Sequence, residues 1–403
     1  MSITNLVSPL GRVCVQDDLW YIATSDNATQ TDFKYVFDVF DFDGNQLIRT
    51  KIYPEPSNYK GYFNVSQVIR NEMKFNWFTP VTQTAIESFL YEPNYLGQIA
   101  SQFQIQVGED FGGVTTLNLE AVDTIVYNYF PTLFNRRDNQ PILSNDIRWN
   151  TNRPLKGIIG STNEKLLVPF KNVGTDLIMR AKGYDSSGTL IYDATSPYTF
   201  QPTNNGLGGA DKKEFVQLDI GLNSVEITCD DFMNINQLAY YDVFFDNNLS
   251  IPSFRVYKNC DKYEVINLYF INAYGMFDTA RFGLVSKLNL DIERKTFSKR
   301  DYRLNSVSVD YKDANDVYVE SKINYGSKIN WKYKLTMDFP SDEEYQWLYE
   351  LIVSPQIYAK LEDGYYPVSI VNTNYEYSKY EFNRLKAFEI EIELNQPRFG
   401  YRR

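Results

Sequence analysis

The chain has 403 residues, of which 43% are hydrophobic and 23% charged, so it holds enough apolar residues to form several cores. Its net charge of −11 argues against non-specific nucleic-acid binding, because such binding needs a basic surface. Histidine is absent, which excludes histidine-dependent catalytic triads and histidine-ligated zinc or haem. The 32 tyrosines and 27 phenylalanines favour β-structure, because aromatic side chains suit half-buried strands.

Two further features bear on where the chain resides. There is no run of about 18 apolar residues and no recognisable signal peptide, so we expect no transmembrane segment and synthesis in a cytosol. Cys14, Cys229 and Cys260 are too few and too far apart for a disulfide framework or a zinc site. We predict that they are buried free thiols.

The first predicted domain spans residues 1–140, where short strand-like runs alternate with turns as in a β-sandwich. Within residues 33–53 the sequence DFDGN looks like the start of a calcium loop. No EF-hand register fits, because none places Gly44 at position 6 together with a glutamate at position 12. Asp43-Gly44 between apolar runs instead predicts a two-residue hairpin turn. An isolated calcium site of another kind is the alternative.

This turn fixes the register of the predicted hairpin. It places Phe40 opposite Leu47 and the acidic Asp38 opposite the basic Arg49, and such matched pairs stabilise a sheet. We therefore predict a metal-free hairpin.

The second predicted domain spans residues 147–262 and follows a linker at about 134–146. It contains a second hairpin, in which residues 185–188 form the loop and Arg180 lies opposite Asp193. This charge pair falls on the same rung as the first, with the signs exchanged. We interpret the two domains as related β-sandwich modules.

The third predicted domain spans residues 263–403 and is rich in strands around one main helix, residues 342–353. Ser341 and Glu344 have the spacing of a capping box at the start of this helix. Its apolar face is predicted to comprise Tyr345, Leu348, Tyr349 and Ile352, with Trp347 lying off that face. The fold class is therefore mainly β: several antiparallel sandwiches and a C-terminal β domain with one helix.

A strictly alternating strand follows at residues 385–394. Phe388, Ile390, Ile392 and Leu394 share one face, and Glu389, Glu391 and Glu393 share the other. The glutamates are a solvated face in the simpler interpretation; a metal site or a glycosidic acid–base pair is the alternative. We assign no catalytic, cofactor-binding or metal-ligating residue.

Aromatic residues are dense between residues 331 and 380, and we expect some of them to contact a neighbouring subunit. They are Trp331, Tyr333, Tyr345, Trp347, Tyr349, Tyr358, Tyr365, Tyr366, Tyr375, Tyr377 and Tyr380.

Two stretches resemble virion structural proteins of tailed phages, particularly crAss-like phages infecting Bacteroidetes. They are FKYVFDVF with RTKIYPEPSNYKGYFNVSQVIRN, and INAYGMFDTARF with DEEYQWLYELIVSPQIYAKLEDGYYPVSI. The resemblance covers about two-thirds of the chain and carries no catalytic residue.

The resemblance implies a non-enzymatic subunit of a tail or neck assembly in the virion. Such a subunit forms a homo-oligomeric ring and contacts other tail or neck proteins, while DNA at most passes through without specific binding. The glutamates of residues 389–393 would then line the passage. A receptor- or carbohydrate-binding tail protein and a glycan-degrading enzyme with two carboxylates are the alternatives.

Overall fold

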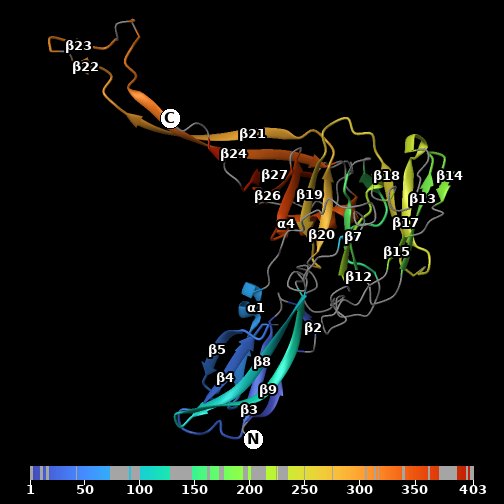
Figure 1. The fold of residues 1–403 in the computed structure, drawn as a ribbon, viewed down its shortest axis with the longest axis vertical. Coiled ribbons are helices and arrows are strands. Elements are labelled where there is room, and N and C mark those ends of the chain that lie inside the picture. Colours follow the sequence, from blue (N-terminus) through green and yellow to red (C-terminus); the bar gives the residue numbers. More distant parts are fainter. Residues whose placement is uncertain are drawn as a thin grey trace. The chain divides into compact units, whose positions relative to one another are not determined.

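A computed structural model describes most of the chain and confirms the mainly β fold (Figure 1). The described residues are 3–9, 12–14, 18–41, 43–72, 90–91, 100–127, 148–160, 164–171, 177–193, 198–200, 215–223, 225, 235–248, 250–274, 276–304, 306–312, 315, 317–337, 341–361, 364–371, 388–395 and 398–399. None of the helices among them is both long and apolar enough to cross a membrane.

The chain divides into two compact units, each assembled from several segments. Unit 1 consists of residues 1–260, 270–279 and 346–355. Unit 2 consists of residues 261–269, 280–345 and 356–403. Unit 1 contains two separate hydrophobic clusters, one from residues of the first predicted domain and one from the second. The three-domain division itself stays a prediction.

Residues 3–72 and 100–127, which we call module 1, form two sheets. The smaller sheet has the order β1-β3-β6, from β1 (Ile3–Val7), β3 (Trp20–Ser25) and β6 (Gly61–Asn64). The larger has the order β2-β9-β8-β4-β5, from β2 (Arg12–Cys14), β9 (Val114–Tyr127), β8 (Ala100–Phe111), β4 (Lys34–Phe40) and β5 (Gln46–Ile52). Helix α1 (Ser66–Glu72) follows β6. Buried side chains from both sheets form one cluster, as in a β-sandwich.

Residues 148–258 with Leu90–Tyr91, which we call module 2, have the same plan, and Leu90–Tyr91 adds one edge strand that module 1 lacks. The smaller sheet has the order β10-β12-β16-β7, from β10 (Arg148–Trp149), β12 (Leu167–Lys171), β16 (Phe215–Asp219) and β7 (Leu90–Tyr91). The larger has the order β11-β18-β17-β13-β14, from β11 (Ile158–Gly160), β18 (Phe254–Lys258), β17 (Tyr240–Phe245), β13 (Leu177–Tyr184) and β14 (Leu190–Asp193). Strand β15 (Tyr198–Phe200) also pairs with β13, and a 3₁₀ helix spans Ile235–Gln237.

The two modules share strand directions as well as strand order. In each larger sheet the first strand is parallel to its neighbour, and the pairs that form the central hairpins are antiparallel. One side-chain oxygen has the same role in both. Asn64 Oδ1 accepts hydrogen bonds from the amides of Leu19 and Ser66, and Asp219 Oδ1 accepts them from Leu166 and Gly221. These correspondences support the interpretation of two related modules.

The central hairpins of the modules end in equivalent loops. The amide of Asp41 donates to the carbonyl of Asn45, and the amide of Gly44 donates to that of Asp41. Asp185, Gly188 and Thr189 repeat both bonds. Both glycines have φ of +82°. The predicted two-residue turn at Asp43-Gly44 and the predicted four-residue loop at residues 185–188 are therefore both wrong. Each loop has three residues between the bonded pair and places glycine in the left-handed region.

The longer loop changes part of the predicted register. Asp38 lies opposite Arg49 as predicted, but a bulge places Phe40 opposite Gln46 instead of Leu47. In module 2, Asp193 lies opposite Lys182, so the predicted partner Arg180 is wrong. Counted from the loop, Lys182–Asp193 is the position equivalent to Asp38–Arg49. Arg180 still reaches Asp193 diagonally, at 3.7 Å between nitrogen and oxygen.

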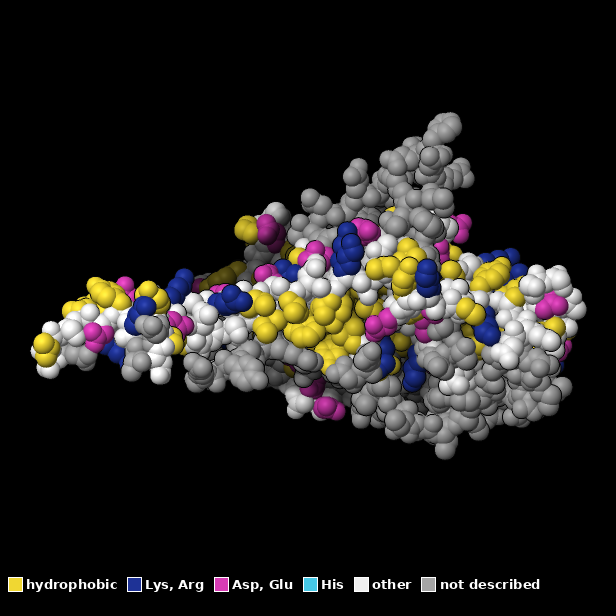
Figure 2. Space-filling model, turned by 90° about the horizontal axis from the view of Figure 1, so that it is seen from above, with side chains coloured by type: hydrophobic (Ala, Val, Ile, Leu, Met, Phe, Trp, Pro, Cys, Tyr) yellow, Lys and Arg dark blue, Asp and Glu magenta, His cyan; other side chains and the backbone are white. Residues whose placement is uncertain are grey.

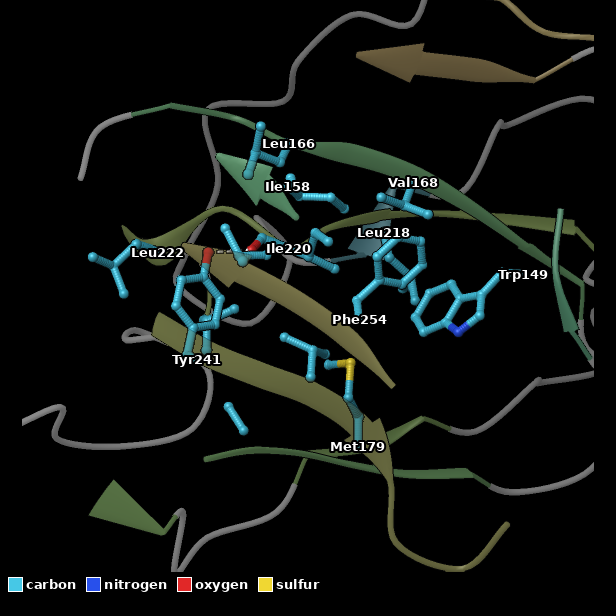
Figure 3. Packing of buried hydrophobic residues seen from close by; sticks show 14 of the residues in the cluster. Trp149, Ile158, Leu166, Val168, Met179, Leu218, Ile220, Leu222, Tyr241 and Phe254 are labelled. Atoms are coloured by element: carbon cyan, nitrogen blue, oxygen red, sulfur yellow. Dashed lines mark hydrogen bonds between the residues drawn. The ribbon is translucent and has the colours of Figure 1, made fainter. Parts of the chain in front are cut away.

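The core of module 2 lies between its two sheets (Figure 3). Trp149, Val168 and Leu218 come from the smaller sheet and face Met179 and Phe254 of the larger one. The Trp149 ring lies edge-on to Phe254, with 4.6 Å between ring centroids. A tightly packed aromatic core of this kind holds the sandwich together.

Most of the C-terminal strands belong to one eight-stranded sheet. Its order is β20-β19-β25-β26-β27-β24-β21, from β20 (Phe277–Phe282), β19 (Ile266–Ile271), β25 (Ile357–Leu361), β26 (Gly364–Ile370), β27 (Phe388–Leu394), β24 (Lys322–Met337) and β21 (Lys287–Ser298). The eighth strand, β28 (Arg398–Phe399), lies off this path and pairs with β24. Strands β22 (Arg303–Leu304) and β23 (Val309–Asp310) form a separate two-stranded sheet. The predicted alternation of residues 388–394 is confirmed, since the apolar side chains of β27 are buried.

Helix α4 (Asp342–Val353) has the predicted bounds, and its capping box is present. The amide of Glu344 donates to Ser341 Oγ, and the amide of Ser341 donates to Glu344 Oε2. The predicted buried face is only partly right, because the buried residues are Trp347, Leu348, Glu350 and Leu351. Periodicity placed Trp347 on the outer side, but this side of the helix also packs against protein.

Candidate interaction surface

Strands β21 and β24 form an arm, which we define as residues 287–334. The two strands run outwards together, with the short strands β22 and β23 beyond them (Figure 1). Every residue of β21 is exposed, although the strand is paired along its whole length. Because β21 is the last strand in the sheet order, its other edge has no strand partner among the described residues. The arm therefore exposes far more surface than a strand within a folded domain.

One face of the arm is apolar. Residues directly opposite each other in an antiparallel pair share a face of the sheet, so the pairing register defines the composition of that face. The pairs on the apolar face are Leu288–Tyr333, Leu290–Trp331 and Ile292–Ile329. Leu288, Leu290 and Ile292 are 46%, 50% and 44% exposed. Hydrophobic side chains along the arm, at the left of the view, are visible in Figure 2.

This apolar face continues a buried one. Along β24, Leu335 and Met337 share the face of Tyr333 and lie opposite Ile390 and Phe388 of β27. All four of these side chains are buried. Phe388 packs against Phe282 and Tyr345, with ring centroids 6.2 and 5.7 Å apart. The face of the sheet that is buried at Leu335 and Met337 thus continues along the arm, where the side chains of β21 on this face are exposed to solvent. Such a surface is typical of a protein interface.

The opposite face of the arm is polar, and at its base it carries lysines of β24 beside glutamates of the neighbouring strand β27. Glu391 and Glu393, predicted as part of a row of glutamates, lie opposite Lys334 and Lys332. Glu389 forms an ion pair with Lys334, with 2.6 Å between nitrogen and oxygen. The lysines of β24 therefore offset the charge of the glutamates, which weakens the case for a like-charged lining of a DNA passage.

The aromatic residues of the 331–380 segment are not gathered on one surface. Trp347 is buried, where its ring packs against Phe270 with 5.5 Å between centroids, so it is not among the aromatic residues available to a neighbouring subunit. Tyr365 packs against Tyr269. Trp331 and Tyr333 belong to the apolar face of the arm. Tyr375, Tyr377 and Tyr380 lie outside the described residues.

A buried acidic pair lies within unit 1. Asp278 accepts hydrogen bonds from Thr151 Oγ1 at 2.6 Å and from Trp347 Nε1 at 2.9 Å. Glu350 accepts one from Asn152 Nδ2 and one from the amide of Ala273. These bonds join a loop of module 2 to β20, to the turn after β19 and to helix α4. This pair could not be predicted from the sequence, because sequence spacing does not reveal which acids meet in space.

Burial governs the ionisation of both acids. It raises the pKa of Asp278 to about 6 and that of Glu350 to about 7, against the opposing effect of their hydrogen bonds. Their side chains are nearly inaccessible, with Asp278 at 0% and Glu350 at 4% exposure. A glycan therefore has no access to this pair in the described structure. The observed hydrogen bonds of the two acids are all to other residues of the chain and hold its segments together.

The structure also bears on the predictions for the DFDGN loop and for the cysteines. In the DFDGN loop, Asp41 accepts hydrogen bonds from the amide and side chain of Asn45, and the Asn45 side chain holds the pKa of that carboxyl below its usual range. No cluster of three metal-ligating side chains occurs among the described residues. Cys260 is a free thiol but is exposed, so its predicted burial is wrong. Cys14 and Cys229 are not described at the side-chain level.

The arm itself was not identified from the sequence. The alternation of Leu288, Leu290 and Ile292 is visible in the letters KLNLDIE and is typical of a strand with one buried face. Periodicity predicts that such a face will be covered, but it does not say by which chain. Comparison of the sequence with protein-family models found no match, and comparison with curated proteins found none.

Proposed function

We propose that the chain is a non-enzymatic structural subunit of a tailed-phage tail or neck, acting by self-assembly and by contacts with other virion proteins. The observation that carries the proposal is the apolar face of the arm, which continues the sheet core into solvent. A surface of this kind lowers its free energy by binding another protein. The resemblance to phage virion proteins supplies the biological setting.

The virion setting is tested on particles. Antibodies against the chain are expected to label purified virions at one fixed position along the tail or neck in negative-stain images. Absence of the chain from purified particles, as measured by mass spectrometry, would overturn this setting.

The role of the arm in assembly is tested in solution. Sedimentation velocity of the full chain over a range of concentrations is expected to show association that Leu290→Ser with Ile292→Ser weakens. The matched control is Asn330→Ser, which changes a residue on the polar face of β24, away from the free edge of β21. A full chain that stays monomeric at high concentration, alone and with its neighbouring virion proteins, is incompatible with the proposal.

Binding of a host glycan is a second candidate, favoured by the outer end of the arm. Tyr311 and Tyr318 are 56% and 71% exposed, and exposed aromatic rings can stack on sugars. Tyr311 also packs against Tyr302, with 6.2 Å between centroids. Glycan-array binding that Tyr311→Ala with Tyr318→Ala abolishes, while association remains, would favour this candidate.

A further inference from the structure

We propose that the partner of β21 is β21 of a second copy of this chain, paired antiparallel about a twofold axis at Leu290. The inference rests on the proposed function and identifies one of its contacts. Strand β21 has the two properties that such pairing needs. One edge is unpaired among the described residues, and all of its residues are exposed. Edge strands of this kind are templates for pairing with another chain.

Symmetry limits the possible registers. A twofold axis perpendicular to the sheet keeps each side chain on its own face, so the axis must pass through a residue position and not between two residues. Pairing then joins residues whose numbers add to twice that of the central residue. Each candidate register can therefore be judged from the sequence of β21 alone.

A register centred on Leu290 matches every position from 287 to 293. Leu290 lies opposite its own copy, and Leu288 lies opposite Ile292 of the second copy, so apolar residues meet on the apolar face. On the polar face, Lys287 lies opposite Glu293 and Asn289 lies opposite Asp291. By symmetry the dimer therefore contains two ion pairs, each between Lys287 of one copy and Glu293 of the other.

The neighbouring registers are worse. Centring on Asp291 places that aspartate opposite its own copy. Centring on Ile292 places Asp291 opposite Glu293 and Leu290 opposite Arg294. Centring on Asn289 pairs only residues 287–291 within β21, which begins at Lys287, whereas centring on Leu290 pairs residues 287–293. Like charges directly opposite each other destabilise a sheet, so Leu290 is the favoured centre.

The direction of pairing also suits the charge of the arm. Residues 294–303 carry five basic side chains and one acidic side chain, whereas the whole chain carries −11. Antiparallel pairing directs this basic segment of each copy towards the base of the other copy's arm. The arm contains eleven basic and seven acidic residues, a balance of +4, so the remaining residues carry −15. The basic segment of one copy is therefore brought near an acidic partner chain.

Disulfide trapping tests the register directly. In a background with Cys14, Cys229 and Cys260 changed to Ser, Leu290→Cys is expected to give an oxidised dimer. Opposite residues in an antiparallel pair lie about 4.5–5.5 Å apart at Cα, within the range of a disulfide. Ile292→Cys is the matched control, because its two copies would be offset by four residues, about 14 Å along the strands. A mixture of Leu288→Cys and Ile292→Cys chains should form the mixed dimer.

Charge exchange provides a second test. Lys287→Glu is expected to weaken dimerisation about tenfold, because each copy then places glutamate opposite Glu293. Adding Glu293→Lys should restore it. Equal trapping at positions 290 and 292, or no rescue by the double exchange, overturns the inference. A third outcome separates this inference from the proposed function. If Leu290→Ser with Ile292→Ser abolishes association but Leu290→Cys gives no disulfide dimer, the arm still acts in assembly and only the pairing with β21 of a second copy is refuted.

Discussion

Asp278 and Glu350 illustrate how single residues in this chain are governed by their surroundings. Both are acids in positions where water is excluded, and each retains its place through hydrogen-bond donors from other segments. Burial disfavours the charged form, and the donors only partly offset this effect. Below their raised pKa values the two groups are neutral, and the network then contains no buried net negative charge.

The raised pKa values predict how stability depends on pH. Burial raises the pKa of Asp278 to about 6 and that of Glu350 to about 7, whereas unfolded acids titrate near about 4. At these two sites the folded chain therefore binds more protons than the unfolded chain between about pH 4 and 7. The contribution of this pair to the free energy of unfolding falls as pH rises through that interval and levels off above it.

Asp278→Asn tests this prediction, because it removes the charge and keeps an oxygen for Thr151 and Trp347. We expect the free energy of unfolding at pH 8 to increase by on the order of 2 kcal/mol, since one pKa unit corresponds to about 1.4 kcal/mol. The dependence on pH should become weaker. Urea unfolding between pH 4.5 and 8 measures both, with Asp43→Asn in an exposed loop as control. A less stable variant at pH 8 would show that the ionised form is required.

The ion pair of Asp38 with Arg49 leads to a second prediction. The guanidinium donates to both carboxylate oxygens, at 2.8 and 2.6 Å, and the Asp38 side chain is fully buried. Arg49→Met would leave a buried carboxylate without this partner, so we expect the melting temperature to fall by several degrees. Lys334→Met breaks the exposed pair with Glu389 and should change it little. Equal effects in thermal melts would contradict this distinction.

At the scale of elements, the hairpin loops give a third prediction. Gly44 and Gly188 both have φ of +82°, a conformation that costs other residues roughly 1–2 kcal/mol. A Cβ atom at Gly44 would meet no other atom, so Gly44→Ala isolates the cost of the backbone conformation. We expect Gly44→Ala and Gly188→Ala to destabilise by similar amounts. Gly364→Ala, also in open space but without positive φ, is the control. Unfolding curves that do not distinguish the three would refute the equivalence of the loops.

Local elements were predictable where a short-range signal fixed them. The capping box of α4 and the alternation of β27 depend on residues a few positions apart, and both are present. The hairpin register failed near its loop, because Asp43-Gly44 also fits a three-residue loop with one glycine in the left-handed region. Trp347 was placed wrongly because tertiary contacts surround more of α4 than one apolar stripe.

The apolar face of the arm could not be predicted from the sequence, for a different reason. Leu288, Leu290 and Ile292 have the pattern of an ordinary half-buried strand, and only the three-dimensional arrangement shows that this chain leaves them exposed. The related modules were predictable from their hairpins, whereas the shared role of Asn64 and Asp219 was not. That role depends on hydrogen bonds between residues 45 and 53 positions apart in the chain.

At the scale of the whole molecule, charge is unevenly distributed, and this leads to the last prediction. The arm carries +4 while the remaining residues carry −15. If the basic segment of one copy lies near the acidic remainder of another, association should weaken as the salt concentration rises. The reason is screening, because the distance over which exposed charges interact falls from about 10 Å at 0.1 M salt to about 3 Å at 1 M. Sedimentation between 0.05 and 1 M salt, roughly the interval over which this screening changes most, is the measurement. Arg294→Ser with Lys295→Ser should reduce both the association and its salt dependence, whereas Lys360→Ser, outside the arm, should change neither. Association that strengthens with salt would mean that apolar contact alone drives it, and would refute a role for these charges.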